Sequence, residues 1–175
     1  MRVISGIYKG RKLSGYNIDG TRPIMDRVKE SIFAMINSYT NEAKVLDLFA
    51  GSGSLGIEAL SNGASSCIFV DMNSVCINHI KNNTKNMPCV TIEKNNYKNV
   101  LNKYQDEKFD LIFLDPPYIL KIFDDIINFL IEKEMLNEDC IIVCHYDKNP
   151  PSEILKLWKE KIYKNKTIKI FKYNA

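Results

Sequence analysis

The feature that most constrains this chain is a repeated alternation of short apolar runs with segments of helical periodicity. Five runs, at 44–50, 65–72, 89–94, 109–115 and 140–146, are rich in β-branched and aromatic residues and predict strands. Runs that are apolar throughout and separated by helices are typical of a parallel sheet covered on both faces. Such a sheet binds its ligand at the carboxyl ends of the strands, where the strand order reverses.

The intervening segments and the two ends complete the expected α/β fold. The C-terminal stretch 161–173 predicts a hairpin turned at 164–166, which adds an antiparallel strand to the sheet. Residues 2–13 alternate and turn at glycines, so we expect a short β-hairpin arm there. We divide the chain into an N-terminal arm, 1–24, and a main domain, 25–175. Helices are predicted at 26–39, 54–63, 74–86, 97–107, 122–136 and 152–161. Val28, Ile32, Met35 and Ile36 of the first, and Val75, Ile77 and Ile80 of the third, are expected to face the core.

Length and composition restrict the class of protein. The 175 residues are 45% apolar, which suits one domain with a small appendage. No run reaches the roughly 18 apolar residues of a membrane span, and no signal peptide is visible, so we expect an intracellular, cytoplasmic protein. The five cysteines lack CxxC spacing, and we expect Cys67, Cys140 and Cys144 to be buried reduced thiols. His79 and His145 lack metal-ligand spacing, so no metal is predicted.

Basic residues gather at both ends of the chain. The net charge is only +3, but the acids crowd the middle of the sequence. Two basic ends around a neutral-to-acidic body fit a polyanionic partner. An ordinary solvated surface explains the C-terminal lysines equally well, whereas the arginine-rich N-terminal cluster favours nucleic acid. Residues 1–29 carry Arg2, Lys9, Arg11, Lys12, Arg22, Arg27 and Lys29 against Asp19 and Asp26.

A glycine loop follows the first strand in "DLFAGSGSLG". Its GxGxxG pattern at Gly51, Gly53 and Gly56 lets the backbone approach a nucleotide, and Asp71 at the end of the second strand suits ribose hydroxyls. Both features fit NAD and other adenosine cofactors equally. Asp47, directly before the loop, favours S-adenosylmethionine, because a carboxylate repels a pyrophosphate but attracts an ammonium and a sulfonium.

The fourth strand ends in "IFLDPPY". Neither proline can continue a sheet, and Pro116 holds Asp115 in an extended conformation. The Asp115 carboxylate and the Pro116 carbonyl are suited to accept the two hydrogens of an exocyclic nucleobase amine, and Asp115 to take the departing proton. Tyr118 is suited to stack on the base. We therefore expect amine methylation at this strand end.

Two further stretches narrow the family. "LDLFAGSGSLGIEALSNGA" with "LDPPY" resembles a class I S-adenosylmethionine-dependent methyltransferase of the amino-methylating type. "MRVISGIYKGRKL" and "TRPIMDRVKESIF" resemble the opening of the bacterial small-subunit (16S) ribosomal RNA guanine-N2 methyltransferase family (RsmD-like). The resemblance covers nearly the whole chain. It implies a Rossmann-like fold with a seven-stranded, mostly parallel sheet, and methylation of a guanine N2 in 16S ribosomal RNA, of the guanine-966 type. We expect the chain to be a monomer.

The resemblance also implies roles for individual residues. The guanine would meet Asp115, Pro116 and Tyr118, and Asp26 and Glu30 would tie the arm to the catalytic face. The sequence departs from the family at Lys29, at Asn96 and at Cys144–His145, which stands where a glutamate is usual. The cofactor would be lined by Asp47, Phe49, Gly51, Ser52, Gly53, Asp71, Met72 and Asn96, and the RNA by Arg2, Arg11, Arg22, Arg27 and Pro117.

Three other functions remain as alternatives. An amino-methyltransferase acting on DNA adenine, on cytosine N4 or on a protein glutamine shares the chemistry, but commonly has Asn at the position of Asp115. An NAD-dependent oxidoreductase fits GxGxxG, but Asp47 and the DPPY turn oppose it. A non-catalytic RNA-binding assembly factor has no need of the intact Asp115.

Overall fold

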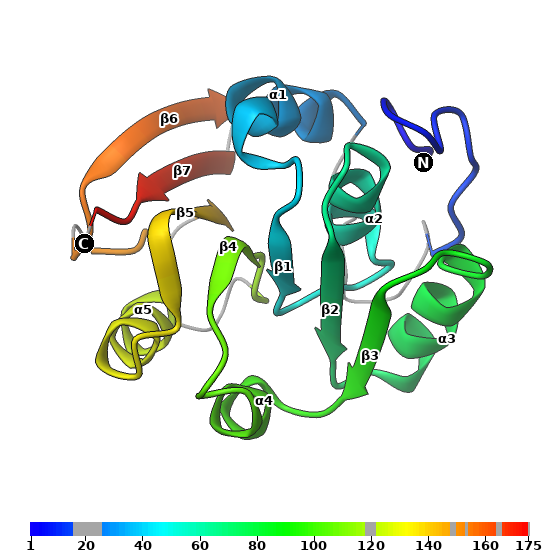
Figure 1. Ribbon diagram of the computed structural model, residues 1–175. Helices are drawn as coiled ribbons and strands as arrows, with labels where there is room; N and C mark the ends of the chain where they lie inside the picture. The colour runs from blue at the N-terminus through cyan, green and yellow to red at the C-terminus, as the bar shows by residue number, and fades with distance from the viewer. Residues whose placement is uncertain (16–25, 118–121, 148–149, 153, 164–165, 175) are drawn as a thin grey trace.

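The fold is a seven-stranded sheet with helices on both faces (Figure 1). The computed structural model describes residues 1–15, 26–117, 122–147, 150–152, 154–163 and 166–174. The strands are β1 Lys44–Asp47, β2 Ser66–Asp71, β3 Val90–Lys94, β4 Phe109–Leu114, β5 Leu136–Tyr146, β6 Leu157–Tyr163 and β7 Lys166–Lys172. The helices are α1 Asp26–Ile36, α2 Ser54–Ser61, α3 Ser74–Asn83, α4 Tyr97–Lys103 and α5 Phe123–Glu132, with a 3₁₀ turn, η1, at Asn37–Tyr39.

The strand order is β3-β2-β1-β4-β5-β7-β6. Strands β1 to β5 are parallel, and β7 runs antiparallel between β5 and β6. The chain builds outward from β1 through β2 to β3, then returns to the other side of β1 with β4. This reversal puts the ligand-binding position of the fold at the carboxyl ends of β1 and β4. The predicted mostly parallel sheet with an antiparallel C-terminal hairpin is confirmed.

Alternate residues of each strand supply two separate apolar layers. Val45, Phe113 and Val143 pack beneath α1, α2 and α3, whereas Leu46 and Ile112 pack against α4 and α5. Because both faces are covered, the central strands are apolar at nearly every position, as the sequence pattern indicated. Residues that share the parity of Phe113 therefore face α1 to α3, and this decides which side Asp115 occupies.

The predicted helix at 152–161 is wrong. Residues Leu157–Tyr163 form β6, which pairs with β7 at the edge of the sheet. Ile154, Leu157 and Trp158 stand at helical spacing in the sequence. However, β7 offers an open row of backbone groups, and the ring of Trp158 packs edge-on against Tyr39 at 5.2 Å. Tertiary pairing overrides a weak local propensity here.

Two smaller expectations are also corrected. Val75 does not face the core: it is 50% exposed, and Cys76 takes the inward position beside Ile77 and Ile80. The helix predicted to reach 136 ends at Glu132, because Glu134 adopts a positive φ of 52° and turns the chain into β5. Strand β5 consequently starts four residues earlier than expected.

The N-terminal arm is an irregular loop closed by a single antiparallel bridge between Arg2 and Lys12. Its apolar residues Val3 and Leu13 are buried in the same cluster as α1 and α2. The arm crosses α2 and approaches α3 (Figure 1). The division at residue 24 falls outside the described residues and stays a prediction.

The described residues also bear on the cysteine and membrane expectations. All five cysteines are free, and Cys67, Cys140 and Cys144 are buried, as predicted. Burial raises the pKa of each of these three thiols, which keeps them protonated. Within the described ranges, no helix is long and apolar enough to cross a bilayer.

Candidate active site at the carboxyl ends of β1, β2 and β4

Three carboxylates meet at one edge of the sheet. Asp47 ends β1, Asp71 ends β2 and Asp115 follows β4 directly. In the register, Asp47 lies opposite Phe69 and Phe113, so Asp71 and Asp115 each stand two residues further along a neighbouring strand. Both negative charges act on Asp47. The sequence therefore brings together three acids that lie 24 and 44 positions apart along the chain.

Asp47 is held beneath the glycine loop. Its Oδ2 accepts a hydrogen bond from the Gly56 N–H at 3.0 Å, and the residue is 2% exposed. Burial raises the pKa of Asp47 to about 7; the Gly56 hydrogen bond opposes this rise, and the charges of Asp115 and Asp71 add to it. A carboxyl group with this pKa gains from a nearby cation, which stabilises its charged form.

The three glycines serve different physical needs. Gly51 and Gly53 have φ of 56° and 78°, which side chains rarely adopt, and Gly53 precedes α2. A Cβ on Gly51 would meet nothing within 4 Å, so the backbone there borders open space that a ligand can fill. A Cβ on Gly56 would lie 2.3 Å from the ring of Phe69, so that glycine is required by helix-to-strand packing.

Asp71 braces this loop. Its Oδ2 accepts from the Gly51 N–H at 2.9 Å and its Oδ1 from the Asn73 N–H at 2.8 Å. The Cys76 thiol also hydrogen-bonds Asp71. A carboxylate has about four lone-pair positions, so acceptor capacity still remains for a further donor such as a ribose hydroxyl. The neighbouring Met72 is 69% exposed, which leaves its apolar side chain at the surface beside the loop.

The other predicted cofactor residues lie around the same edge. The Oδ1 of Asn96 accepts a hydrogen bond from the Asn99 N–H and caps the N-terminus of α4. The sequence did not indicate this structural role of Asn96. The ring of Phe49 lies 5.8 Å from that of Tyr97, at the start of α4. Ser52 is buried.

Asp115 contacts a residue for which the sequence suggested no role. Its Oδ1 lies 2.8 Å from Nδ1 of His145, at the end of β5. Burial works to lower the pKa of His145, but the charge and hydrogen bond of Asp115 raise it overall. Pro116 is buried and Pro117 is exposed, and Tyr118 lies outside the described residues. The parallel register of β4 and β5 is the signal that could have found His145.

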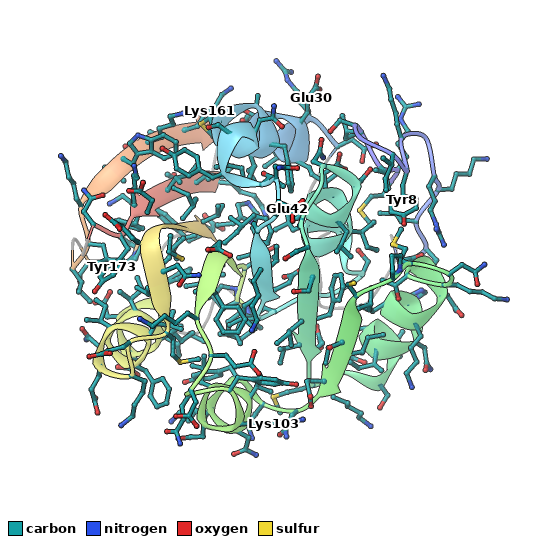
Figure 2. The ribbon with its side chains drawn as sticks, viewed as in Figure 1. Tyr8, Glu30, Glu42, Lys103, Lys161 and Tyr173 are labelled. Atoms are coloured by element: carbon teal, nitrogen blue, oxygen red, sulfur yellow. The ribbon has the colours of Figure 1, made fainter. Side chains whose placement is uncertain are left out.

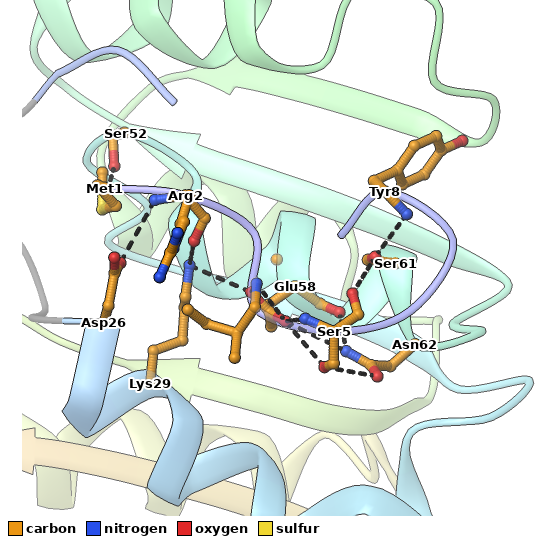
Figure 3. Close-up of polar contacts among 12 residues, drawn as sticks. Met1, Arg2, Ser5, Tyr8, Asp26, Lys29, Ser52, Glu58, Ser61 and Asn62 are labelled. Atoms are coloured by element: carbon orange, nitrogen blue, oxygen red, sulfur yellow. Dashed lines mark hydrogen bonds and ion pairs between the residues drawn. The ribbon is translucent and has the colours of Figure 1, made fainter. Parts of the chain in front are cut away.

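A buried ion pair fastens the arm to the domain (Figure 3). Nζ of Lys29 in α1 lies 3.1 Å from Oε2 of Glu58 in α2, and neither side chain is exposed. Glu58 also accepts from the N–H groups of Ile4 and Ser5, and Lys29 donates to the Arg2 carbonyl at 2.6 Å. Burial lowers the pKa of Lys29, and the charge of Glu58 opposes that change. No local sequence pattern indicated this pair.

The arm also reaches the active edge. The N–H of Arg2 donates to Oδ1 of Asp26 at 3.3 Å, and Ser52 Oγ lies 4.0 Å from the Met1 sulfur. Asn83 of α3 donates to the carbonyls of Ser14 and Ser52, which joins the arm to the glycine loop. The arm is therefore fixed both to the glycine loop and to α1.

The predicted RNA-binding arginines differ in their surroundings. Arg2 and Arg27 are exposed, Arg11 donates to the Lys85 carbonyl at 2.8 Å, and Arg22 lies outside the described residues. Glu30 is exposed on α1.

Two lysines of the C-terminal hairpin hold that hairpin to α1. Lys159 donates to the Met35 carbonyl and Lys161 to Ser31 Oγ, where β6 meets α1 (Figure 2). These contacts favour the structural interpretation of those lysines over nucleic-acid binding.

Comparisons with known proteins agree on one family. Residues 1–172 match the family described as "Conserved hypothetical protein 95". A candidate rRNA methyltransferase, YlbH, of Bacillus subtilis is 43% identical over 153 residues, 85% of this chain and 83% of its own. Ribosomal RNA small subunit methyltransferase D of Haemophilus influenzae is 33% identical over 178 residues, 99% of this chain and 91% of its own.

Solved structures share the fold. A candidate methyltransferase, yhhF, from Escherichia coli superposes with a TM-score of 0.89 at 25% identity, and covers 100% of this chain and 98% of its own. More distant chains of the same fold, at 13% identity, were solved in complex with S-adenosyl-L-homocysteine.

Proposed function

The chain belongs to the conserved hypothetical protein 95 family, and from this membership we propose that it methylates the exocyclic N2 of a guanine in small-subunit ribosomal RNA. The protein is a methyltransferase whose methyl donor is S-adenosylmethionine. The observation that carries the finer proposal is the position of Asp115. It stands at the carboxyl end of β4, next to the glycine loop, with one carboxylate edge committed to His145. The proposal places the enzyme in the cytoplasm with its RNA.

The residues at the edge fit the cofactor. Gly51 borders open space, and Asp71 retains acceptor capacity for a ribose hydroxyl. Asp47 gains stability when a cation approaches, which matches the ammonium of the methyl donor. When bound, the cofactor supplies an electrophilic methyl group on a sulfonium. Phe49, Ser52, Gly53, Met72 and Asn96 complete the proposed cofactor lining.

The acceptor amine of guanine is a poor nucleophile because its lone pair is delocalised into the ring. Asp115 and the Pro116 carbonyl accept its two hydrogens and thereby orient the nitrogen lone pair. As nitrogen gains the methyl group it becomes positively charged, and its proton passes to Asp115, directly or through water. Pro117 and Tyr118, the latter outside the described residues, are proposed to contact the base.

Exposed arginines supply the proposed RNA contacts. Arg2 on the arm and Arg27 on α1 are free to meet phosphates, and the Asp26 contact places the two elements side by side. Arg11 and Arg22 complete the proposed set. Because the Lys29–Glu58 pair fixes the arm against α1 and α2, the charges of Arg2 and Arg27 are held close to one another.

Substitution of Asp115 tests the chemistry. Asp115→Ala should lower the rate of methyl transfer to small-subunit RNA by roughly a hundredfold or more, since general-base contributions are typically 10²–10⁴-fold. Binding of S-adenosylhomocysteine, measured by calorimetry, should stay within a few-fold of wild type. The matched control is Asp110→Ala, at the opposite end of the same strand, where the carboxylate accepts from the Lys44 N–H. Normal turnover in Asp115→Ala would sink the mechanism.

The substrate is tested separately. RNA from a strain lacking the gene should gain one N2-methylguanine when treated with the purified protein and methyl donor, as read by mass mapping. Methylation of an adenine or a cytosine, with every guanine unchanged, would replace the substrate while leaving the methyltransferase assignment in place.

A further inference from the structure

The end of β5 lies directly beside Asp115, the proposed proton acceptor. Leu114 of β4 pairs in register with Cys144 of β5, so the next residues, Asp115 and His145, lie side by side. Nδ1 of His145 lies 2.8 Å from Oδ1 of Asp115. The contact joins the proposed proton acceptor to a side chain that has no place in the mechanism so far.

The imidazole is held much more firmly than the carboxylate. The His145 side chain is 3% exposed, whereas that of Asp115 is 22% exposed. His145 also pairs in register with Ile168 of β7, so its backbone is fixed between two strands. A buried ring on a central strand has little freedom to rotate away. Asp115, by contrast, stands just beyond the end of β4.

We infer that His145 is a positioning residue that holds Oδ1 of Asp115 and so aims Oδ2 at the amine of the bound base. This inference rests on the proposed function. It explains why the chain has a hydrogen-bond donor at the end of β5, where an apolar residue would continue the buried pattern of the strand. His145 touches neither the cofactor nor the base in this scheme.

The chemistry of the contact fixes its direction. An ionised carboxylate only accepts hydrogen bonds, so Nδ1 of His145 carries the hydrogen. With Oδ1 held, rotation about the Cβ–Cγ bond of Asp115 is restrained, and the carboxylate keeps one orientation before the base arrives. The proton released from the amine goes to Oδ2 and then to water, while the proton on His145 stays in place.

Two amide substitutions of His145 distinguish the role of Nδ1 from that of Nε2. Asn can place its amide nitrogen near the position of Nδ1, whereas the longer Gln places it near Nε2. We expect His145→Gln to lower kcat roughly ten- to hundredfold, with KM for RNA and affinity for S-adenosylhomocysteine within a few-fold of wild type. His145→Asn should recover most of the lost kcat, which a merely structural role does not predict.

Each result bears on the inference. Wild-type kcat in His145→Gln, or equal losses in both variants with cofactor binding intact, would overturn it while the proposed function stands. Cofactor affinity and activity lost together would reduce His145 to a structural role. Wild-type protein inactive on small-subunit RNA would remove the proposed function and this inference with it.

A measurement on the unmodified protein avoids the risk of misfolded variants. Nitrogen-15 NMR of the His145 ring in wild-type protein should show a protonated Nδ1. Asp115→Asn should shift that resonance, because the charged acceptor is lost. A ring protonated only at Nε2 would contradict the inference without any enzyme assay.

Discussion

Asp47 is the most deeply buried of the three carboxylates at the active edge. It is 2% exposed, and two further acids stand at the ends of the adjacent strands. The same burial that raises its pKa to about 7 makes the cofactor-free protein less stable when Asp47 is ionised. The proposed cofactor-binding role of Asp47 therefore carries a cost in folding stability, and that cost depends on pH.

The cost can be measured with Asp47→Asn. Between the unfolded pKa of 3.8 and the folded pKa of about 7, the native protein holds a proton that the unfolded chain releases, so stability falls as pH rises. Asn still accepts from the Gly56 N–H but does not titrate. From pH 5 to pH 7 the wild type should lose about 2 kcal/mol relative to the variant in urea unfolding without cofactor. Equal changes in the two proteins would show that Asp47 titrates normally.

At the scale of elements, the arm, α1 and α2 form one unit through Lys29 and Glu58. Both charges are fully buried, and Glu58 additionally accepts hydrogen bonds from the N–H groups of Ile4 and Ser5 (Figure 3). Breaking a buried pair by removing one partner leaves an uncompensated charge, which is far more costly than the loss of a surface pair. On its other side, α1 is attached to β6 by hydrogen bonds that Lys159 and Lys161 donate to it.

Lys29→Met should therefore destabilise the protein by about 3–5 kcal/mol, measured by chemical denaturation. The arm should also become more sensitive to trypsin at Lys9 and Lys12. A matched control is Lys103→Met on α4 (Figure 2), because the Lys103 side chain is 55% exposed in its pair with Glu93 and should contribute little. The double variant Lys29→Met/Glu58→Gln should recover part of the loss. Similar effects of Lys29→Met and Lys103→Met would refute the anchoring role.

At the scale of the whole molecule, the exposed arginines proposed to bind RNA lie near the acids at the strand ends. The acids gather at the carboxyl ends of β1, β2 and β4, while Arg2 and Arg27 stand on the arm and on the first turn of α1. In the proposed complex, an RNA that contacts these arginines lies near the edge that holds Asp115. The exposed Lys98 of α4 lies on the opposite face of the sheet and should not share in this role.

The proposed RNA surface predicts a specific salt dependence. Arg27→Gln should weaken binding of a small-subunit RNA fragment and reduce the slope of log affinity against log salt by roughly one phosphate contact. Lys98→Gln carries the same loss of charge and should leave both quantities nearly unchanged. Filter binding at several salt concentrations measures both. Equal effects of the two substitutions would indicate only a non-specific response to net charge.

The strand and helix pattern of the central domain was predictable because it is local. Alternating apolar runs and helical periodicity located β1 to β4 and α1 to α4 to within a few residues. The same patterns placed Asp47, Asp71 and Asp115 at strand ends, and a parallel sheet puts such ends together. Local signals failed for Val75 and for β6, where a one-residue phase difference and an available sheet edge decided the outcome.

The sequence by itself thus determined the fold class and the acids that end β1, β2 and β4, among them Asp115, the proposed proton acceptor. Residue order alone specifies which groups end each strand. Only the tertiary structure decided the partners of buried charges. Lys29 with Glu58, and Asp115 with His145, are joined across separate elements by packing and strand register. No local periodicity encodes such contacts, since each requires two distant segments to be folded before the paired groups can meet.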